Sequence, residues 1–323
     1  MPYKRACYSS GALDMAAQGN AIREWREQQG RRWFNVDFEP WSDAPFRFSL
    51  KPVFPELRAA RVAFSPGFTF RDAELVAEGE DAFVVFVSQS RAIDLTLPGR
   101  ELRLGYGDAT LLPTDTTGRV GSRLGMERIA VVIPRPEFAA RDVRTDRAIM
   151  QRLPRQSEGL QLLRSYLRSL EKTRLQNAAG ARETIRRHLV DLAALAMMPN
   201  GAIGESDLTA VTVARVASAL DDIGAHFQEP GLRVEAVSRR LGISPRYLQR
   251  LLESTGTSFT ARVNELRLQE AFRLLAEAHD DSCRVSDIAL QVGFSDISHF
   301  NRLFRAHFGD TPSGVRALRH RAQ

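Results

Sequence analysis

Two short stretches near the C-terminus carry side chains that can bind a nucleic acid. Arginine can pair with guanine through two hydrogen bonds, glutamine and asparagine can pair with adenine, and arginine also binds phosphate. No acidic residue occurs in 246–252 or in 298–307, so both stretches are locally basic although the net charge of the chain is only +6. The predicted contact residues are Ser244, Arg246, Tyr247, Gln249, Arg250, Ser295, Ser298, His299, Asn301, Arg302 and Arg305. The alternative for each is a contact with phosphate alone, or none.

A repeated pattern explains how these side chains would be positioned. Segments 237–244 and 288–295 each place a glycine four residues after a small residue, followed by an apolar residue and a serine. Gly242 and Gly293 suit the left-handed backbone of a tight turn. The serine can cap the helix that follows, and Asp296 is a second candidate for the second cap. Two such copies predict two helix-turn-helix motifs.

The helices expected around these turns share an apolar face, and they span 211–227, 233–241, 245–254, 258–276 and 296–307. The helix over 258–276 would be roughly 28 Å long, and adjacent major-groove segments lie ~34 Å apart. It would therefore hold two recognition helices, 245–254 and 296–307, for successive grooves of one duplex.

The C-terminal third also matches a known pattern. The residues that carry it are Ser244-Pro245-Arg246-Tyr247-Leu248, Arg267-Leu268, Ala271, Leu274-Leu275, Ile288-Ala289, Val292-Gly293-Phe294, Phe300-Asn301-Arg302-Leu303-Phe304 and Gly309-Asp310-Thr311-Pro312. This stretch resembles the tandem helix-turn-helix domain of AraC/XylS-type transcription regulators. Val315 departs from the family, which usually has an aromatic residue there. The resemblance implies a sequence-specific regulator, an activator rather than a repressor, with promoter double-stranded DNA, RNA polymerase and a second copy of the chain as partners.

From residue 32 to about residue 135, hydrophobicity alternates with a period near two and turn signals recur regularly, which is typical of a β-sandwich or barrel. Strands are expected at 61–64, 83–87, 93–97, 108–112 and 128–133, with turns at 98–99, 105–108 and 118–125. The run 104–113 looks like the glycine turn and strand of a cupin-type barrel, and the region resembles, more loosely, the N-terminal sensor domain of one AraC/XylS subgroup.

A barrel of this size can hold one small-molecule effector. The candidate effector-binding residues are Trp33, Arg47, Phe48, Arg71 and Phe83. A buried arginine could bind a ligand carboxylate. The alternative is that the aromatic residues fill the barrel and the arginines lie on its surface.

Helical periodicity replaces the alternation at 157–198. We therefore predict a multidomain α+β protein: a cupin-like β-barrel sensor domain at 1–145, a helical pair for dimerisation at 146–200, a linker at 201–210 and an all-α DNA-binding domain at 211–323. His188 is expected on the solvated face of the pair.

Composition argues against several other classes of protein. The six histidines all lie at or beyond His188, so the barrel lacks the histidine ligands of a cupin metal site and the histidine of a catalytic triad. We expect no catalytic residues, no metal and no cofactor. No run of 18 apolar residues and no secretory signal occur, which favours a cytoplasmic protein that does not span a membrane.

Two alternatives stay open from the sequence. The first is an effector-independent regulator whose barrel serves only dimerisation or the binding of a protein partner. The second, which the histidine distribution disfavours, is a cupin enzyme fused to a DNA-binding domain.

Overall fold

The structure, a computed structural model, describes residues 6–9, 15–41, 45–141, 143–173, 179–197, 207–277 and 284–320. The chain forms two compact units, Met1–Val211 and Thr212–Gln323, and each has its own hydrophobic core. Across these described ranges, no helix is both long enough and apolar enough to cross a membrane.

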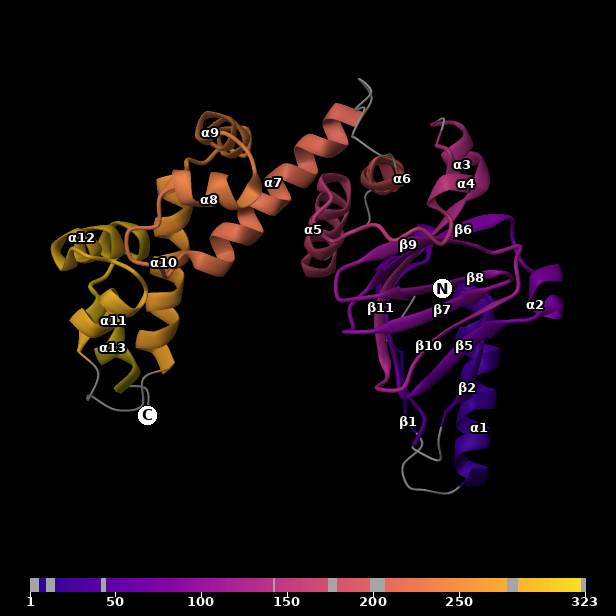
Figure 1. The fold of residues 1–323 in the computed structure, drawn as a ribbon. Helices are drawn as coiled ribbons and strands as arrows, with labels where there is room; N and C mark the ends of the chain where they lie inside the picture. The colour runs from indigo at the N-terminus through magenta and orange to yellow at the C-terminus, as the bar shows by residue number, and fades with distance from the viewer. Residues whose placement is uncertain are drawn as a thin grey trace. The chain divides into compact units, whose positions relative to one another are not determined.

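Unit 1 contains two antiparallel sheets, here called the β domain (Figure 1). In spatial order, the first sheet consists of β1 (Ala6–Ser9), β3 (Arg47–Phe54), β4 (Ala59–Phe64), β11 (Met126–Pro134), β6 (Ala82–Ser88) and β9 (Ala109–Pro113). The second consists of β2 (Asp37–Pro40), β5 (Gly67–Arg71), β10 (Gly118–Ser122), β7 (Ile93–Leu97) and β8 (Arg100–Leu104). The five strands expected from the sequence are confirmed to within two residues.

The turn expected at 118–125 is wrong over its first five residues. Gly118–Ser122 forms β10, which lies between β5 and β7. A Cβ atom at Gly121 would lie 2.6 Å from the Gly67 carbonyl oxygen and 2.6 Å from the Phe68 Cβ. Glycine is present here because the backbones approach closely, and the chain turns only afterwards, at Gly125, where φ is +81°.

The two sheets enclose a continuous apolar core. Residues that face inward on the first sheet, such as Leu50, Phe64 and Phe86, join Phe38 and Leu95 of the second sheet in one cluster. Helix α1 (Met15–Trp25) inserts Trp25 into it, with edge-on ring contacts 5.5 Å from Phe48 and 5.5 Å from Phe64.

The two-residue period expected from residue 32 onward is wrong at its start. Residues Arg26–Phe34 form a π-helix, η1, that follows α1 directly. It buries Gly30, Trp33 and Phe34 on one side and ends at Asn35, whose φ of 49° is left-handed. Trp33 and Phe34 thus enter the core from a helix rather than from a strand.

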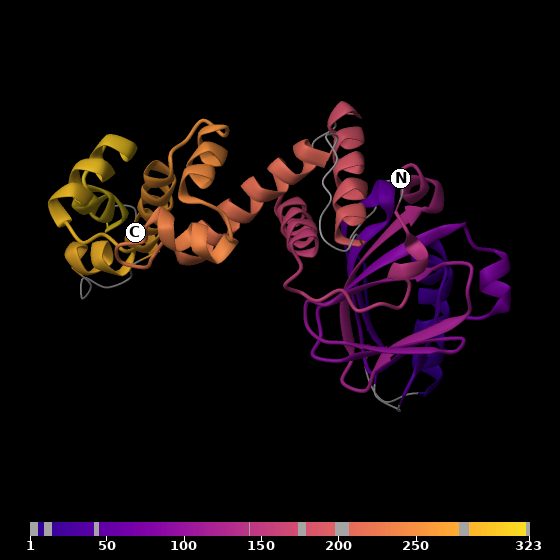
Figure 2. The same cartoon turned by 45° about the horizontal axis from the view of Figure 1, so that its top comes forward.

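Helices cover part of the β domain (Figure 2). The short elements are η2 (Pro55–Leu57), α2 (Ala73–Ala77), α3 (Arg135–Ala139) and α4 (Thr145–Ala148). The expected helical pair is present as α5 (Glu158–Lys172) and α6 (Ala179–Met197), which pack on each other, and α5 also contacts β3. His188 is buried rather than solvated, at 7% exposure, and its Nδ1 lies 3.1 Å from the Tyr166 hydroxyl.

Unit 2 is helical. Its helices are α7 (Asp207–His226), which begins within unit 1, α8 (Val234–Leu241), α9 (Pro245–Glu253), α10 (Phe259–Glu277), α11 (Val285–Gln291), α12 (Ile297–Phe308) and α13 (Pro312–His320). Of the expected linker, residues 201–206 lie outside the described residues, and α7 has already begun at Asp207.

Helix α10 belongs to both cores of unit 2. Val263 packs with the first cluster, around Leu248 of α9. Leu268, Ala271 and Leu275 pack with the second cluster, around Phe300 of α12. One helix therefore supports both helix-turn-helix motifs, as the sequence predicted.

Candidate nucleic-acid interface and ligand cavity

The first recognition helix, α9, is oriented by its buried side. Leu248, Leu251 and Leu252 are at most 3% exposed. The Ser244 hydroxyl caps the helix by accepting the Tyr247 N–H at 3.2 Å, and Gly242 ends α8 with a φ of 67°.

The opposite side of α9 presents polar groups to solvent. Arg246, Gln249 and Arg250 are exposed. Tyr247 is half-buried, and the guanidinium groups of Arg215 and Arg250 lie 5.2 and 5.1 Å from its ring centroid. Such cation–π contacts restrict an arginine without neutralising its charge, so the face remains cationic.

The second recognition helix, α12, also has one buried apolar side and one exposed polar side. Phe300 and Phe304 are fully buried. Ser298, Asn301, Arg302 and Arg305 are exposed, and His299 is half-buried with its Nδ1 3.0 Å from Arg302 Nη2.

Ser295 does not cap α12. The cap is Asp296, whose carboxylate accepts the His299 N–H at 3.0 Å. Backbone N–H groups at the start of α12 lower the pKa of Asp296. The serine is displaced because the second turn is two residues longer than the first: residues 292–296 separate α11 from α12, whereas residues 242–244 separate α8 from α9. Ser295 is exposed.

Arg267 joins the two motifs, a role that the sequence did not reveal. It is 8% exposed, and its Nε and Nη2 donate to the carbonyl oxygens of Phe227 and Glu229 at 2.7 and 2.8 Å. Its guanidinium also lies 5.6 Å from the Phe294 ring centroid in the second motif. Burial lowers its pKa. The sequence signal for its burial is helical spacing, because Arg267 follows Val263, an inward-facing residue of α10, by one turn.

Inside the β domain, a cavity of about 50 Å³ is lined by three arginines: Arg128 is buried, Arg71 is half-buried and Arg119 is exposed. Arg128 is 4% exposed, and its side chain alternates inward with Met126 and Ala130 along β11. Its Nη1 is 3.3 Å from Thr69 Oγ1. Burial, and then repulsion from Arg71, lowers the pKa of Arg128 to about 9.

Arg71 is fixed by the backbone around it. Its guanidinium donates to the carbonyl oxygens of Asn35, Pro113 and Phe34 at 3.1, 3.2 and 2.9 Å. Burial lowers its pKa to about 10, although the charge of Asp115 acts in the opposite direction. Arg71 therefore gives the cavity positive charge, while each of its guanidinium nitrogens is already hydrogen-bonded to a backbone carbonyl.

The other predicted effector residues do not line this cavity. Arg47 is exposed at the start of β3. Trp33 and Phe48 are part of the apolar core. Phe83 faces away from that core, with its ring 5.8 Å from Phe138 of α3. Of the five, only Arg71 borders the cavity.

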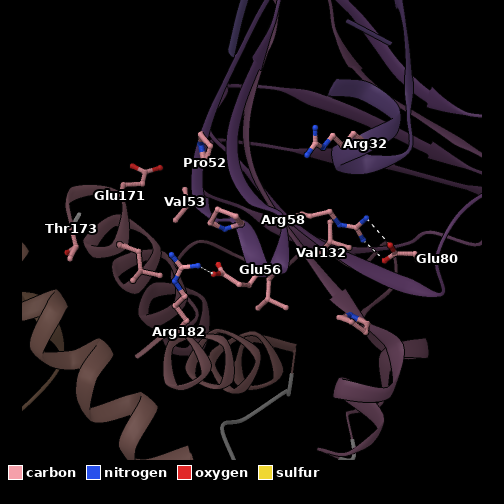
Figure 3. Close-up of a pocket in the computed structure, with 14 residues that line it drawn as sticks. Arg32, Pro52, Val53, Glu56, Arg58, Glu80, Val132, Glu171, Thr173 and Arg182 are labelled. Carbon is pink, nitrogen blue, oxygen red and sulfur yellow. Dashed lines mark hydrogen bonds and ion pairs between the residues drawn. The ribbon is translucent and has the colours of Figure 1, made fainter. Parts of the chain in front are cut away.

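A larger cleft of about 780 Å³ lies where β3, η2 and β11 meet the helical pair (Figure 3). Its charged groups largely neutralise one another. Arg58 pairs with Glu80 and Arg182 pairs with Glu56, at 2.7 and 2.8 Å. Glu171 pairs with Arg61 of β4. The cleft thus differs from the inner cavity, whose described lining includes three arginines and no acidic residue.

Within the described part of the chain, no three histidine, cysteine, aspartate or glutamate residues are grouped so that they could hold a metal ion.

Comparison with known proteins assigns the family. Residues 25–198 match the AraC-binding-like domain, and residues 237–317 match a helix-turn-helix domain. Because the first match covers more than half of the chain, the protein belongs to the AraC family of transcription regulators.

The chain is also similar to individual known proteins. The chain is 27% identical to the transcriptional activator RhrA of Rhizobium meliloti over 71% of its own length and 72% of the relative. It is 32% identical to the activator RhaS of Escherichia fergusonii over 45% of its length and 51% of the relative. The crystal structure of the AraC-like activator CuxR covers 84% of this chain and is covered over 96% of its own, with a TM-score of 0.46 at 17% identity.

Proposed function

We propose that this protein is a cytoplasmic transcription activator that binds promoter DNA through α9 and α12. The observation that carries the proposal is the pair of capped recognition helices, each with a buried apolar side and an exposed arginine-rich side, packed on α10. At 19 residues, α10 is roughly 28 Å long, which suits two successive major-groove segments. The activators among the relatives support activation, and with it a contact with RNA polymerase.

The contact set that we propose retains all eleven residues predicted from the sequence. Arg246, Gln249, Arg250, Asn301 and Arg302 have the side-chain types suited to base edges. Ser244 is engaged as a cap, so we propose that it acts through the orientation of α9. Ser295, Ser298, Tyr247, His299 and Arg305 complete the set as candidates for phosphate or water-mediated contacts.

The β domain would act as the sensor in this proposal. Strands of both sheets line its inner cavity. A ligand bound there would change the packing of side chains between the sheets. We propose that the effector binds in this cavity and that the helical pair α5–α6 provides the homodimer contact. The protein would act by binding alone, with no catalytic step.

Enrichment of random duplexes on the purified protein, followed by hydroxyl-radical footprinting, tests the DNA-binding part. We expect two protected segments about one helical turn apart on the same face of the duplex. A single protected segment per protomer, or protection without sequence preference, would contradict it.

A further inference from the structure

The inner cavity of the β domain contains a positive charge without an acidic partner. Arg128 forms no ion pair with any acidic side chain in the ranges that the structure describes. Its surroundings are aromatic: the guanidinium carbon is 6.0, 5.1 and 5.4 Å from the ring centroids of Phe34, Phe64 and Phe86. An ion buried without a counter-ion costs several kcal/mol, and aromatic faces offset only part of that.

The hydrogen bonds of Arg128 use only part of its guanidinium group. Those found with the described residues all come from Nη1, to Thr69 Oγ1 at 3.3 Å, which is long, and to the Met126 sulfur, a weak acceptor, at 3.5 Å. Thr69 Oγ1 itself donates to the Val120 carbonyl. A guanidinium carries five N–H donors in a planar arrangement that matches a carboxylate.

Arg71 differs from Arg128 in its hydrogen bonds. Each of its three guanidinium nitrogens donates a hydrogen bond to a backbone carbonyl. It raises the positive potential of the cavity, whereas Nε and Nη2 of Arg128 form no hydrogen bond with the described residues. Apart from Thr69, Thr116 and the exposed Arg119, the rest of the lining is apolar, with Val84, Leu112 and Ala130 among it.

We propose that this cavity binds a compact monocarboxylate, with its carboxylate on the Arg128 guanidinium and its apolar body against the surrounding side chains. This inference rests on the proposed sensor role and names the chemical class of the effector. A carboxylate needs only two parallel donors, whereas a phosphate has more oxygens than the guanidinium of Arg128 can satisfy.

The size of the cavity limits the body of the ligand. A water molecule needs about 10–15 Å³ of such space. A cavity of about 50 Å³ therefore holds a carboxylate with a very short chain unless the lining moves.

Calorimetry on the full-length protein tests the proposal with propionate as the probe and propionamide as its neutral, equally sized control. We expect saturable binding of one propionate per chain and at least tenfold weaker binding of propionamide. Equal binding of the two would overturn the proposal, and so would binding of inorganic phosphate or chloride in preference to propionate.

Two variants locate the site. Arg128→Met keeps the volume and removes the buried charge, so we expect propionate affinity to fall at least tenfold while the Tm of the ligand-free protein rises. Arg128→Lys keeps the charge without the planar donor pair and should bind with intermediate affinity. Arg47→Met, the same change at an exposed arginine of the β domain, should leave binding unchanged. Unaltered affinity in Arg128→Met and Arg128→Lys would refute the site.

The outcomes separate this inference from the proposed function. Binding of a neutral probe that depends on Val84 or Leu112 would retain the sensor role and overturn the carboxylate. The footprint measures DNA binding independently of the effector. If the protein binds promoter DNA but no carboxylate, only the carboxylate proposal is refuted.

Discussion

Arg246 on α9 and Arg302 on α12 are exposed side chains on the two recognition helices. If both contact bases, Arg246→Ala and Arg302→Ala should each cost ~1–3 kcal/mol of specific binding and relax specificity at one position. Titrations against the selected operator and its single-base variants measure this.

Arg273→Ala is the matched control for both. Arg273 is exposed on α10, but Glu270 and Glu277 neutralise it, so its loss should leave operator affinity unchanged. A uniform loss across all sequences in Arg246→Ala, with a salt slope lower by about one, would instead identify a phosphate contact.

Arg267 should matter for stability rather than for readout. Arg267→Ala leaves the carbonyl oxygens of Phe227 and Glu229 without this hydrogen-bond donor. An unsatisfied buried acceptor lowers the free energy of unfolding by about 1–3 kcal/mol. We expect a lower urea midpoint for unit 2. Arg267→Lys should recover part of the loss, and an unchanged midpoint in Arg267→Ala would show that the bridge contributes nothing.

The two turn glycines look equivalent in the sequence but differ in the structure. Both have positive φ, +67° at Gly242 and +99° at Gly293. A Cβ at Gly242 would meet nothing within 4 Å, whereas one at Gly293 would lie 2.8 Å from the Gln228 carbonyl oxygen and 2.9 Å from Arg267 Nε.

Alanine at each position separates backbone strain from crowding. Gly242→Ala should cost roughly 1–2 kcal/mol for the left-handed backbone. Gly293→Ala should cost about 1–3 kcal/mol more, because the neighbours must also move. Denaturant unfolding of the two variants gives the difference, and equal losses would mean that the second turn relaxes freely.

Helix α6 should confer a pH dependence on unit 1. Burial lowers the pKa of His188 below its ordinary value of 6.5, Asp191 opposing and Arg187 reinforcing the shift. The unfolded chain therefore takes up this proton more readily than the folded one. The contribution to stability is complete above pH 6.5 and falls as the pH drops below it.

His188→Gln can keep a hydrogen bond to Tyr166 without a titratable ring. Urea unfolding between pH 5 and pH 8 should show a weaker fall in stability on the acidic side for His188→Gln than for the unmodified protein. Equal slopes would assign the pH dependence to other groups.

How far the sequence predicts these elements depends on how local their causes are. The α9 cap and the left-handed turns follow from residue types within a few positions, and they were predicted. Strand β10 was not, because Gly118 and Gly121 are present for a contact with β5 and β7 that is distant in sequence. Burial of Arg128 was also missed, although its alternation with Met126 and Ala130 was visible.

For the whole molecule, the arrangement of α9 and α12 on one α10 leads to a prediction about operator spacing. Because both helices belong to one packed unit, the distance between the two base segments that they read is fixed. Inserting either 5 or 10 base pairs between those segments should reduce affinity to that of one motif, since α10 cannot lengthen.

An insertion between the sites of two protomers should behave differently. If the protein binds as a homodimer, 10 added base pairs return the two sites to the same face of the duplex, whereas 5 added base pairs place them on opposite faces. Gel-shift titrations on the four operators should therefore show loss for both insertions within a site, and loss only for the 5-base-pair insertion between sites. Recovery at 10 base pairs within a site would mean that α9 and α12 act on DNA as separable units, contrary to the shared support of α10.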